Sequence, residues 1–197
     1  MRIDLSKRDI PAPSIREALE IYARNSLQKL GTIVELGCIR QPVRHPLNDG
    51  SRCDACLDGH STAEWARSGF DFVSVDIHPG HAAIAQEVAP GRVVCADGLH
   101  FLRRFSGKIS LLFLDAFDAD LPDSAEKHLE AFQIALPKMA SSSLILIDDT
   151  DVEYDHKAGF FRKPDGFGGK GKLVIPAAIE AGYQVIFEGR QTLLGRF

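Results

Sequence analysis

Acidic residues stand at the carboxyl ends of short apolar runs in this chain, where their side chains could act on a ligand. Such acids are Asp76, Asp97, Asp115, Asp148 and Asp149, and Glu35 lies near the end of the first run. If the runs are parallel strands, their carboxyl ends meet at one edge of the sheet, where open α/β sheets bind ligands. The spacing therefore predicts one acidic ligand site.

Asp76 and Asp97 suit different parts of a nucleoside. A carboxylate such as that of Asp76 offers the acceptors that the paired hydroxyls of a ribose need, although it could also be a solvated acid at a strand end. Asp97 could accept a hydrogen bond from an exocyclic amine such as that of adenine. It could equally cap a helix that starts at Leu99.

Asp115, Asp148 and Asp149 follow two runs that should be neighbouring strands, so we expect their carboxylates to converge. Unpaired carboxylates at close range repel and raise one another's pKa. A hard divalent cation bound by oxygen ligands relieves that repulsion. The sequence predicts a metal here, with a helix cap and two solvated acids as the alternative.

The first run ends at Gly37, and glycine at such a turn lets backbone N–H groups approach a ligand. The turn lacks the G-x-G-x-x-G pattern of dinucleotide-binding proteins. In dinucleotide-binding folds the acid follows the glycines of the first turn by about 20 residues. The distance from Glu35 to Asp76 is longer than that by roughly another 20 residues. We interpret residues 40–59 as an insertion, after which His60 and Ser61 resume the first strand-to-helix unit.

Apolar runs alternate with amphipathic patterns along the chain, which indicates a parallel sheet covered by helices on both faces. The predicted strands are 32–38, 72–77, 92–96, 109–114, 143–147, 183–188 and 191–197. The predicted helices are 14–30, 61–68, 81–88, 99–105, 125–138 and 172–181. The expected fold is α/β, a Rossmann-like doubly wound sheet of about seven strands, mostly parallel with an antiparallel final strand.

The length of 197 residues and the ordinary composition predict a single domain over 1–197. A net charge of −4 argues against a nucleic-acid partner. No apolar run approaches the 18 or so residues of a membrane helix, and the first residues lack the pattern of a signal peptide. We expect a cytoplasmic protein without a membrane partner, and the oligomeric state stays open, with a homodimer as one alternative.

The motifs ELG, VDI, ADG, LDAFDADLPD and LIDD, read in order, resemble the class I S-adenosylmethionine-dependent methyltransferases. More specifically, they resemble the metal-dependent O-methyltransferases of the catechol and macrocin type, over roughly residues 32–150. The resemblance implies methyl transfer from S-adenosylmethionine to a hydroxylated small molecule, with Mg²⁺ or another divalent cation. The cofactor residues that it and the insertion imply are Glu35, Gly37, Cys38, His60, Ser61, Asp76, Ile77, Asp97, Gly98 and Asp115. The implied metal ligands are Asp115, Asp148 and Asp149.

The general base is not fixed by this resemblance, because Asp118 stands where the catechol enzymes carry a catalytic Lys. Candidates are Asp118, His156 and Lys157, each of which could also be an ordinary loop residue. Two other functions stay open. The string LDAFDADLP also resembles aminopropyltransferases of the spermidine synthase type, although the amino-terminal β-hairpin region common there is not expected in this chain, and a cofactor-binding domain without catalysis is the third.

Two loops could shape the acceptor site. In 40–59 and the residue that follows, His45, Cys53, Cys56 and His60 could bind zinc; the cysteines could instead pair or stay free. Residues 150–172 could form a lid over the acceptor or a disordered surface loop. In the lid, Arg162, Lys163 and Lys170 could meet an anionic or sugar substrate or remain solvated. The other cysteines, Cys38 and Cys95, are expected to be buried.

Overall fold

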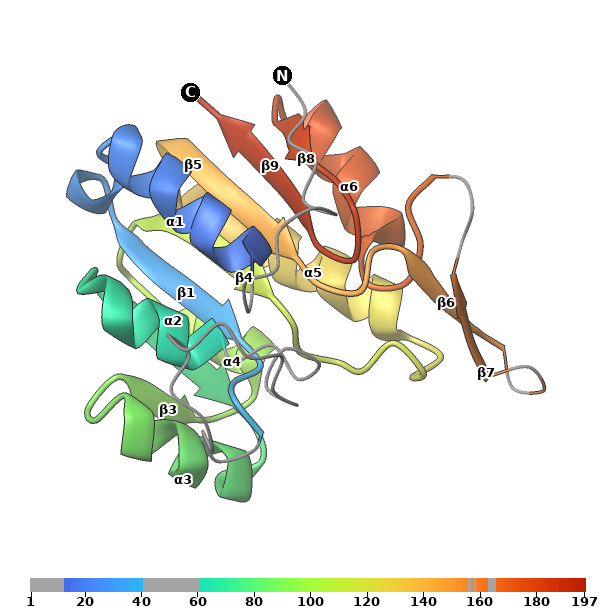
Figure 1. The fold of residues 1–197 in the computed structure, drawn as a ribbon, viewed down its shortest axis with the longest axis horizontal. Helices are drawn as coiled ribbons and strands as arrows, with labels where there is room; N and C mark the ends of the chain where they lie inside the picture. Colours follow the sequence, from blue (N-terminus) through green and yellow to red (C-terminus); the bar gives the residue numbers. More distant parts are fainter. Residues whose placement is uncertain (1–12, 41–60, 156, 158, 163–165) are drawn as a thin grey trace.

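The computed structural model describes residues 13–40, 61–155, 157, 159–162 and 166–197 (Figure 1). A seven-stranded sheet forms the centre, in the order β3-β2-β1-β4-β5-β9-β8. Its strands are β1 (Thr32–Leu36), β2 (Phe72–Asp76), β3 (Val93–Cys95), β4 (Ile109–Leu114), β5 (Met139–Ile147), β8 (Gln184–Phe187) and β9 (Thr192–Arg196). The first five pair in parallel, and β9 is antiparallel to both of its neighbours. The predicted fold class is confirmed.

Helices cover both faces of the sheet. They are α1 (Pro13–Arg24), α2 (Ser61–Ser68), α3 (Pro79–Val88), α4 (Gly98–Arg104), α5 (Ser124–Ala135) and α6 (Gly171–Glu180), with the short 3₁₀ turns η1 (Leu27–Lys29) and η3 (Leu136–Lys138). Buried side chains of α1 and α2 pack on the face seen in Figure 1, and those of α4, α5 and α6 pack on the opposite face. None of the helices in the described ranges has the length and apolar character needed to cross a membrane.

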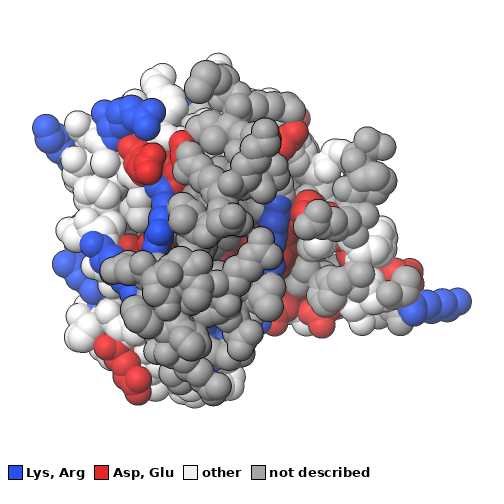
Figure 2. Space-filling view, in the orientation of Figure 1, with Lys and Arg blue, Asp and Glu red and all other residues white. Residues whose placement is uncertain are grey.

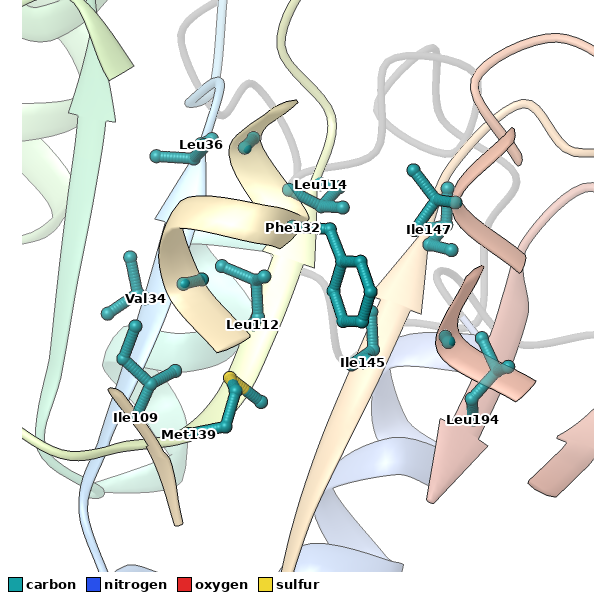
Figure 3. Close-up of a cluster of buried hydrophobic side chains, with 14 of the residues drawn as sticks. Val34, Leu36, Ile109, Leu112, Leu114, Phe132, Met139, Ile145, Ile147 and Leu194 are labelled. Carbon is teal, nitrogen blue, oxygen red and sulfur yellow. The ribbon is translucent and has the colours of Figure 1, made fainter. Parts of the chain in front are cut away.

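The core lies in two apolar layers, one on each side of the sheet. All six residues of β4 are buried. Leu112 and Leu114 point toward Phe132 of α5, as Figure 3 shows, whereas Leu111 and Phe113 pack in the other layer. Each fully buried side chain of this kind contributes roughly 1.5–3 kcal/mol, so the central strands hold the loops at their carboxyl ends in fixed positions.

Several predicted boundaries were wrong. The first helix ends at Arg24 rather than residue 30, because Ser26 takes a left-handed conformation (φ 55°). The strand predicted to start at residue 143 begins at Met139. Cys38 is buried as expected, but Cys95 is exposed because β3 is the edge strand of the sheet.

The segment 150–172 contains a hairpin that we did not predict. Strands β6 (Val152–Asp155) and β7 (Gly159–Arg162) pair in antiparallel fashion and project away from the main sheet (Figure 1, Figure 2). Residues 171 and 172 already belong to α6. The described part of this segment therefore contains regular structure, and its role as a lid over a substrate stays a prediction.

Candidate active site

A cavity of about 230 Å³ opens at the carboxyl ends of β1, β2, β3 and β4. The strand order reverses between β1 and β4, so the cavity lies at the topological switch point where doubly wound sheets bind ligands. Four of its lining residues are acids: Asp76, Asp97, Asp115 and Asp118. The convergence of strand-end carboxylates predicted from the sequence is thus present in the fold.

Gly37 ends β1 at the wall of this cavity and cannot be replaced without displacing its neighbour. Its φ is 86°, and a Cβ atom there would lie 2.5 Å from the carbonyl oxygen of Asp115. A left-handed conformation and a close backbone approach both require glycine. Gly37 therefore lets the loops after β1 and β4 meet side by side.

Asp76 is held in place by the backbone. The N–H of His78 donates to its Oδ1 (2.7 Å), and the N–H of Cys38 donates to its Oδ2 (3.2 Å). The side chain of Asp76 still lines the cavity. Cys38 itself is not among the described lining residues, so its contribution is the main-chain hydrogen bond that orients Asp76.

Of the two roles that the sequence left open for Asp97, the helix cap is confirmed and the contact with adenine stays a prediction. It caps α4 by accepting a hydrogen bond from the N–H of His100 (2.7 Å), and it also lines the cavity. Gly98 and Ile77 line the same region. Ile77 is 69% exposed, which is unusual for a large apolar side chain and gives this part of the cavity an apolar wall.

Glu35 does not line the cavity in the described structure, contrary to the predicted role. Its side chain is fully buried and accepts hydrogen bonds from four neutral donors: the hydroxyls of Ser61, Thr62 and Ser74 and the indole N–H of Trp65. Burial raises the pKa of Glu35, and these hydrogen bonds oppose that rise. Glu35 and Ser61 therefore tie β1, β2 and α2 together beneath the cavity, while His60 lies outside the described residues.

The carboxylates of Asp115, Asp148 and Asp149 come together as predicted. Oxygen atoms from all three lie within 4.8 Å of one another. However, the ammonium group of Lys170 lies between them, with Nζ 2.6 Å from Asp115 Oδ1, 3.2 Å from Asp149 Oδ2 and 4.0 Å from Asp148 Oδ2. Lys170 is 1% exposed, so the expectation that it is solvated or meets a substrate is wrong.

These residues do not fit a divalent cation while Lys170 is in place. Three carboxylates are a suitable ligand set for Mg²⁺, but the ammonium already occupies the space among their oxygens, and two cations there would repel. Burial alone would lower the pKa of Lys170, yet the three carboxylates raise it, so the ammonium stays charged. Burial and the neighbouring Asp115 raise the pKa of Asp148 to about 8, and the Gln191 amide donates to its Oδ1 (2.7 Å).

The glycine-rich run before α6 is the sequence signal for Lys170. A Cβ at Gly168 would lie 2.7 Å from the carbonyl oxygen of Val152, and one at Gly169 would collide with the carbonyl oxygen of Asp149. The N–H of Gly168 also donates to Thr150 O (2.8 Å). The glycine run therefore packs directly on the loop after β5. This packing places the Lys170 side chain in the acidic cluster.

The structure describes two of the three predicted catalytic residues, Asp118 and Lys157, and these two lie in different loops. Asp118 lines the cavity and forms an ion pair with Arg40 (2.8 Å), a contact that the sequence did not reveal. Lys157 is exposed in the turn between β6 and β7, where its N–H donates to Asp155. His156 lies outside the described residues, as do His45, Cys53 and Cys56 of the insertion.

Two non-glycine residues beside the acidic cluster adopt a left-handed backbone, Phe117 (φ 50°) and Asp149 (φ 48°). Phe117 lines the cavity, and its ring meets His128 of α5 edge to face at 5.3 Å. Burial, and secondly the charge of Lys170, lower the pKa of His128 to about 4.

Several solved structures of proteins that are named as methyltransferases share this architecture. An amino pentose methyltransferase from Micromonospora echinaspora, solved with S-adenosylmethionine, covers 98% of this chain and 93% of its own, with 13% identity and a TM-score of 0.56. The chain has the class I S-adenosylmethionine-dependent methyltransferase fold. No protein-family model matches the sequence, and no curated protein matches it.

Two further methyltransferase structures agree with this fold. A putative O-methyltransferase from Klebsiella pneumoniae covers 92% of this chain and 79% of its own, with 17% identity and a TM-score of 0.52. A methyltransferase from Bacteroides fragilis, in complex with S-adenosyl-L-homocysteine, covers 87% of this chain and 74% of its own, with 16% identity and a TM-score of 0.51. The methyltransferase fold thus extends over most of the chain, including the strands whose ends form the cavity.

Proposed function

We propose that this chain is an S-adenosylmethionine-dependent methyltransferase that methylates a hydroxyl group of a small molecule. The observation that carries the proposal is the cavity at the switch point, lined by four carboxylates at strand ends. S-adenosylmethionine carries a sulfonium cation and a ribose, both of which suit such a lining, whereas the pyrophosphate of a dinucleotide would be repelled.

Each end of the cofactor has a counterpart in the cavity. In this proposal Asp76 accepts hydrogen bonds from the ribose hydroxyls, and Ile77, Asp97 and Gly98 surround the adenine. The backbone at Gly37 meets the methionine part. These assignments rest on the position of each side chain along the cavity wall and on the chemistry of its atoms.

A second cavity, of about 160 Å³, could take the acceptor. It lies between the start of α5 and the hairpin strand β6, and Leu121 lines both cavities. Its polar lining comes from Asp120, Ser124, Glu153, Tyr154 and Lys172. Such groups match a hydroxylated small molecule. In this proposal Asp118, which lines the first cavity, accepts the proton that the hydroxyl loses.

Calorimetric titration with S-adenosylmethionine and S-adenosylhomocysteine tests the proposal. Both should bind, and Asp76→Asn should weaken them roughly 10- to 100-fold, because hydrogen bonds to a charged acceptor contribute about 1.5–3 kcal/mol. Glu87→Gln, an exposed acid on α3, is the matched control and should bind as the unmodified chain does. Circular dichroism of both variants separates lost binding from lost folding.

The outcome also separates the alternatives. Absence of binding by either ligand would contradict the proposal and favour a fold without this cofactor. Preference for decarboxylated S-adenosylmethionine would indicate aminopropyl transfer instead. Mass spectrometry of hydroxylated compounds incubated with the protein and S-adenosylmethionine would then identify the acceptor.

A further inference from the structure

Lys170 is one of the largest fully buried side chains of the described structure, and three acidic side chains lie within 4.0 Å of its ammonium group. Its ammonium contacts Asp115 and Asp149 at hydrogen-bond distances and lies 4.0 Å from Asp148. The guanidinium of Arg190 reaches Asp149 from the solvent side (3.4 Å). Three acidic side chains thus share one buried and one half-exposed cationic side chain.

We propose that Lys170 is the built-in cation of this cluster, so that the chain binds no divalent metal at Asp115, Asp148 and Asp149. The ammonium provides the positive charge that the metal would otherwise provide. The metal site predicted from the sequence is therefore replaced in this proposal by an internal ion-pair cluster, because the side chain of Lys170 lies among the three acids.

The backbone around Lys170 prevents its simple withdrawal. The preceding glycines pack against the carbonyl groups of Asp149 and Val152, where any larger residue would collide. Gly168 is bonded to Thr150, and α6 begins immediately after Lys170. To free the carboxylates for a metal, the protein would have to pull a charged group out of a buried set of partners, which is strongly unfavourable.

The position of Lys170 also links the cluster to the cavity. Asp115 lines the cavity and at the same time accepts the hydrogen bond of Lys170 (2.6 Å). Lys170 is therefore a positioning residue for Asp115. If the proposed methyl transfer is correct, on which this consequence rests, the transfer should proceed in the presence of a chelator.

Direct metal binding tests the inference without any need for turnover. We would titrate the purified chain, Lys170→Met and Lys172→Met with Mn²⁺ and follow the free ion by electron paramagnetic resonance. Lys172 is the matched control, since it is a half-exposed lysine two residues away that pairs only distantly with Glu153 (3.9 Å). We expect no saturable site in the unmodified chain or in Lys172→Met, and a gain of at least about tenfold in affinity in Lys170→Met.

Two results would overturn the inference. One is stoichiometric Mn²⁺ binding by the unmodified chain that Asp148→Asn abolishes. The other is a folded Lys170→Met variant that binds no more Mn²⁺ than the control. If Lys170→Met fails to fold, the titration of the unmodified chain and of Asp148→Asn still decides the question. Failure of the proposed function would show separately, as absence of S-adenosylmethionine binding.

Discussion

Glu35 in β1 and Asp148 after β5 are both buried carboxylates of the same sheet, but their neighbours differ. Four neutral donors surround Glu35, and each comes from a strand or helix next to β1. Asp148 lies beside two other carboxylates and the ammonium of Lys170. Hydrogen bonds from neutral groups stabilise Glu35, whereas the charge of an ammonium group stabilises the cluster that contains Asp148.

This difference indicates that Glu35 stabilises the fold, whereas the cluster around Asp148 acts on the cavity. The hydrogen-bond donors of Glu35 come only from the protein, and its side chain has no exposed surface, so its role is structural. The cluster around Asp148 includes Asp115, which faces the cavity, so any change of charge there reaches a bound ligand. Four measurements distinguish the roles of the two sites.

The largest effect should come from Glu35→Ala. Removal of the carboxylate leaves four buried donors without an acceptor, and we expect a loss of about 3–5 kcal/mol in the free energy of unfolding. Urea denaturation followed by circular dichroism measures it. Glu20→Ala, an exposed acid on α1, is the control and should change stability by less than about 0.5 kcal/mol. Equal losses in the two variants would refute the structural role of Glu35.

Gly37→Ala should damage the cavity more than the fold. The new Cβ would collide with the backbone of Asp115 and push β4 and the cavity wall apart. We expect roughly a tenfold or greater loss of S-adenosylmethionine affinity and a stability loss of about 2 kcal/mol. Gly69→Ala has the same sign of φ (73°) but no atom within 4 Å, so it isolates the backbone strain. Identical behaviour of both variants would mean that the close approach at Gly37 does not matter.

Stability should depend on pH through His128. Its pKa is lowered from 6.5 to about 4 in the folded chain, so the unfolded chain binds the proton more tightly. The contribution of His128 to the free energy of unfolding should therefore be fully present above about pH 6.5. It should fall as the pH drops toward 4, by up to about 1.4 kcal/mol per pH unit. His128→Gln should lose this dependence, whereas His100→Gln, at an exposed position, should keep it. Parallel curves for all three proteins would contradict the prediction.

The smallest effect should come from Arg190→Gln. Arg190 contacts Asp149 at 3.4 Å, but about half of its side chain is exposed. Exposed ion pairs contribute about 0–1 kcal/mol, so the thermal unfolding midpoint should barely move and high salt should remove the difference. A loss of about 3 kcal/mol or more, the size expected when a buried ion pair loses one partner, would show that the cluster depends on Arg190 as strongly as on a buried cation.

The fold could be predicted because its central strands, such as β1 and β4, are buried on both faces. Residues 111–114 form an unbroken apolar run, and the predicted strand 109–114 matches the bounds of β4. The acids at strand ends were also visible, since position along a strand fixes the edge at which a side chain lies. The approximate fold and the cavity edge therefore follow from local pattern.

The partners of those acids could not be predicted in the same way. Lys170 stands in a glycine-rich stretch that looks solvated, and its burial depends on packing against residues about 20 positions away along the chain. The hydrogen-bond donors of Glu35 lie on α2 and β2, the helix and the strand that follow β1 in the chain. No local sequence pattern predicts that they contact Glu35. Cys95 was assigned to the core because the sequence does not show which strand lies at the edge.

The left-handed backbone at Phe117 and Asp149 has a consequence for engineering. Each such residue costs roughly 1–2 kcal/mol relative to an ordinary conformation, and glycine at either position would recover part of that cost. Yet glycine would also delete a cavity-lining ring or a carboxylate of the cluster. At Asp149 the loss exceeds the gain, because removing one partner of the buried Lys170 ammonium costs about 3–5 kcal/mol. Selection for heat resistance should therefore retain the strained aspartate at this position.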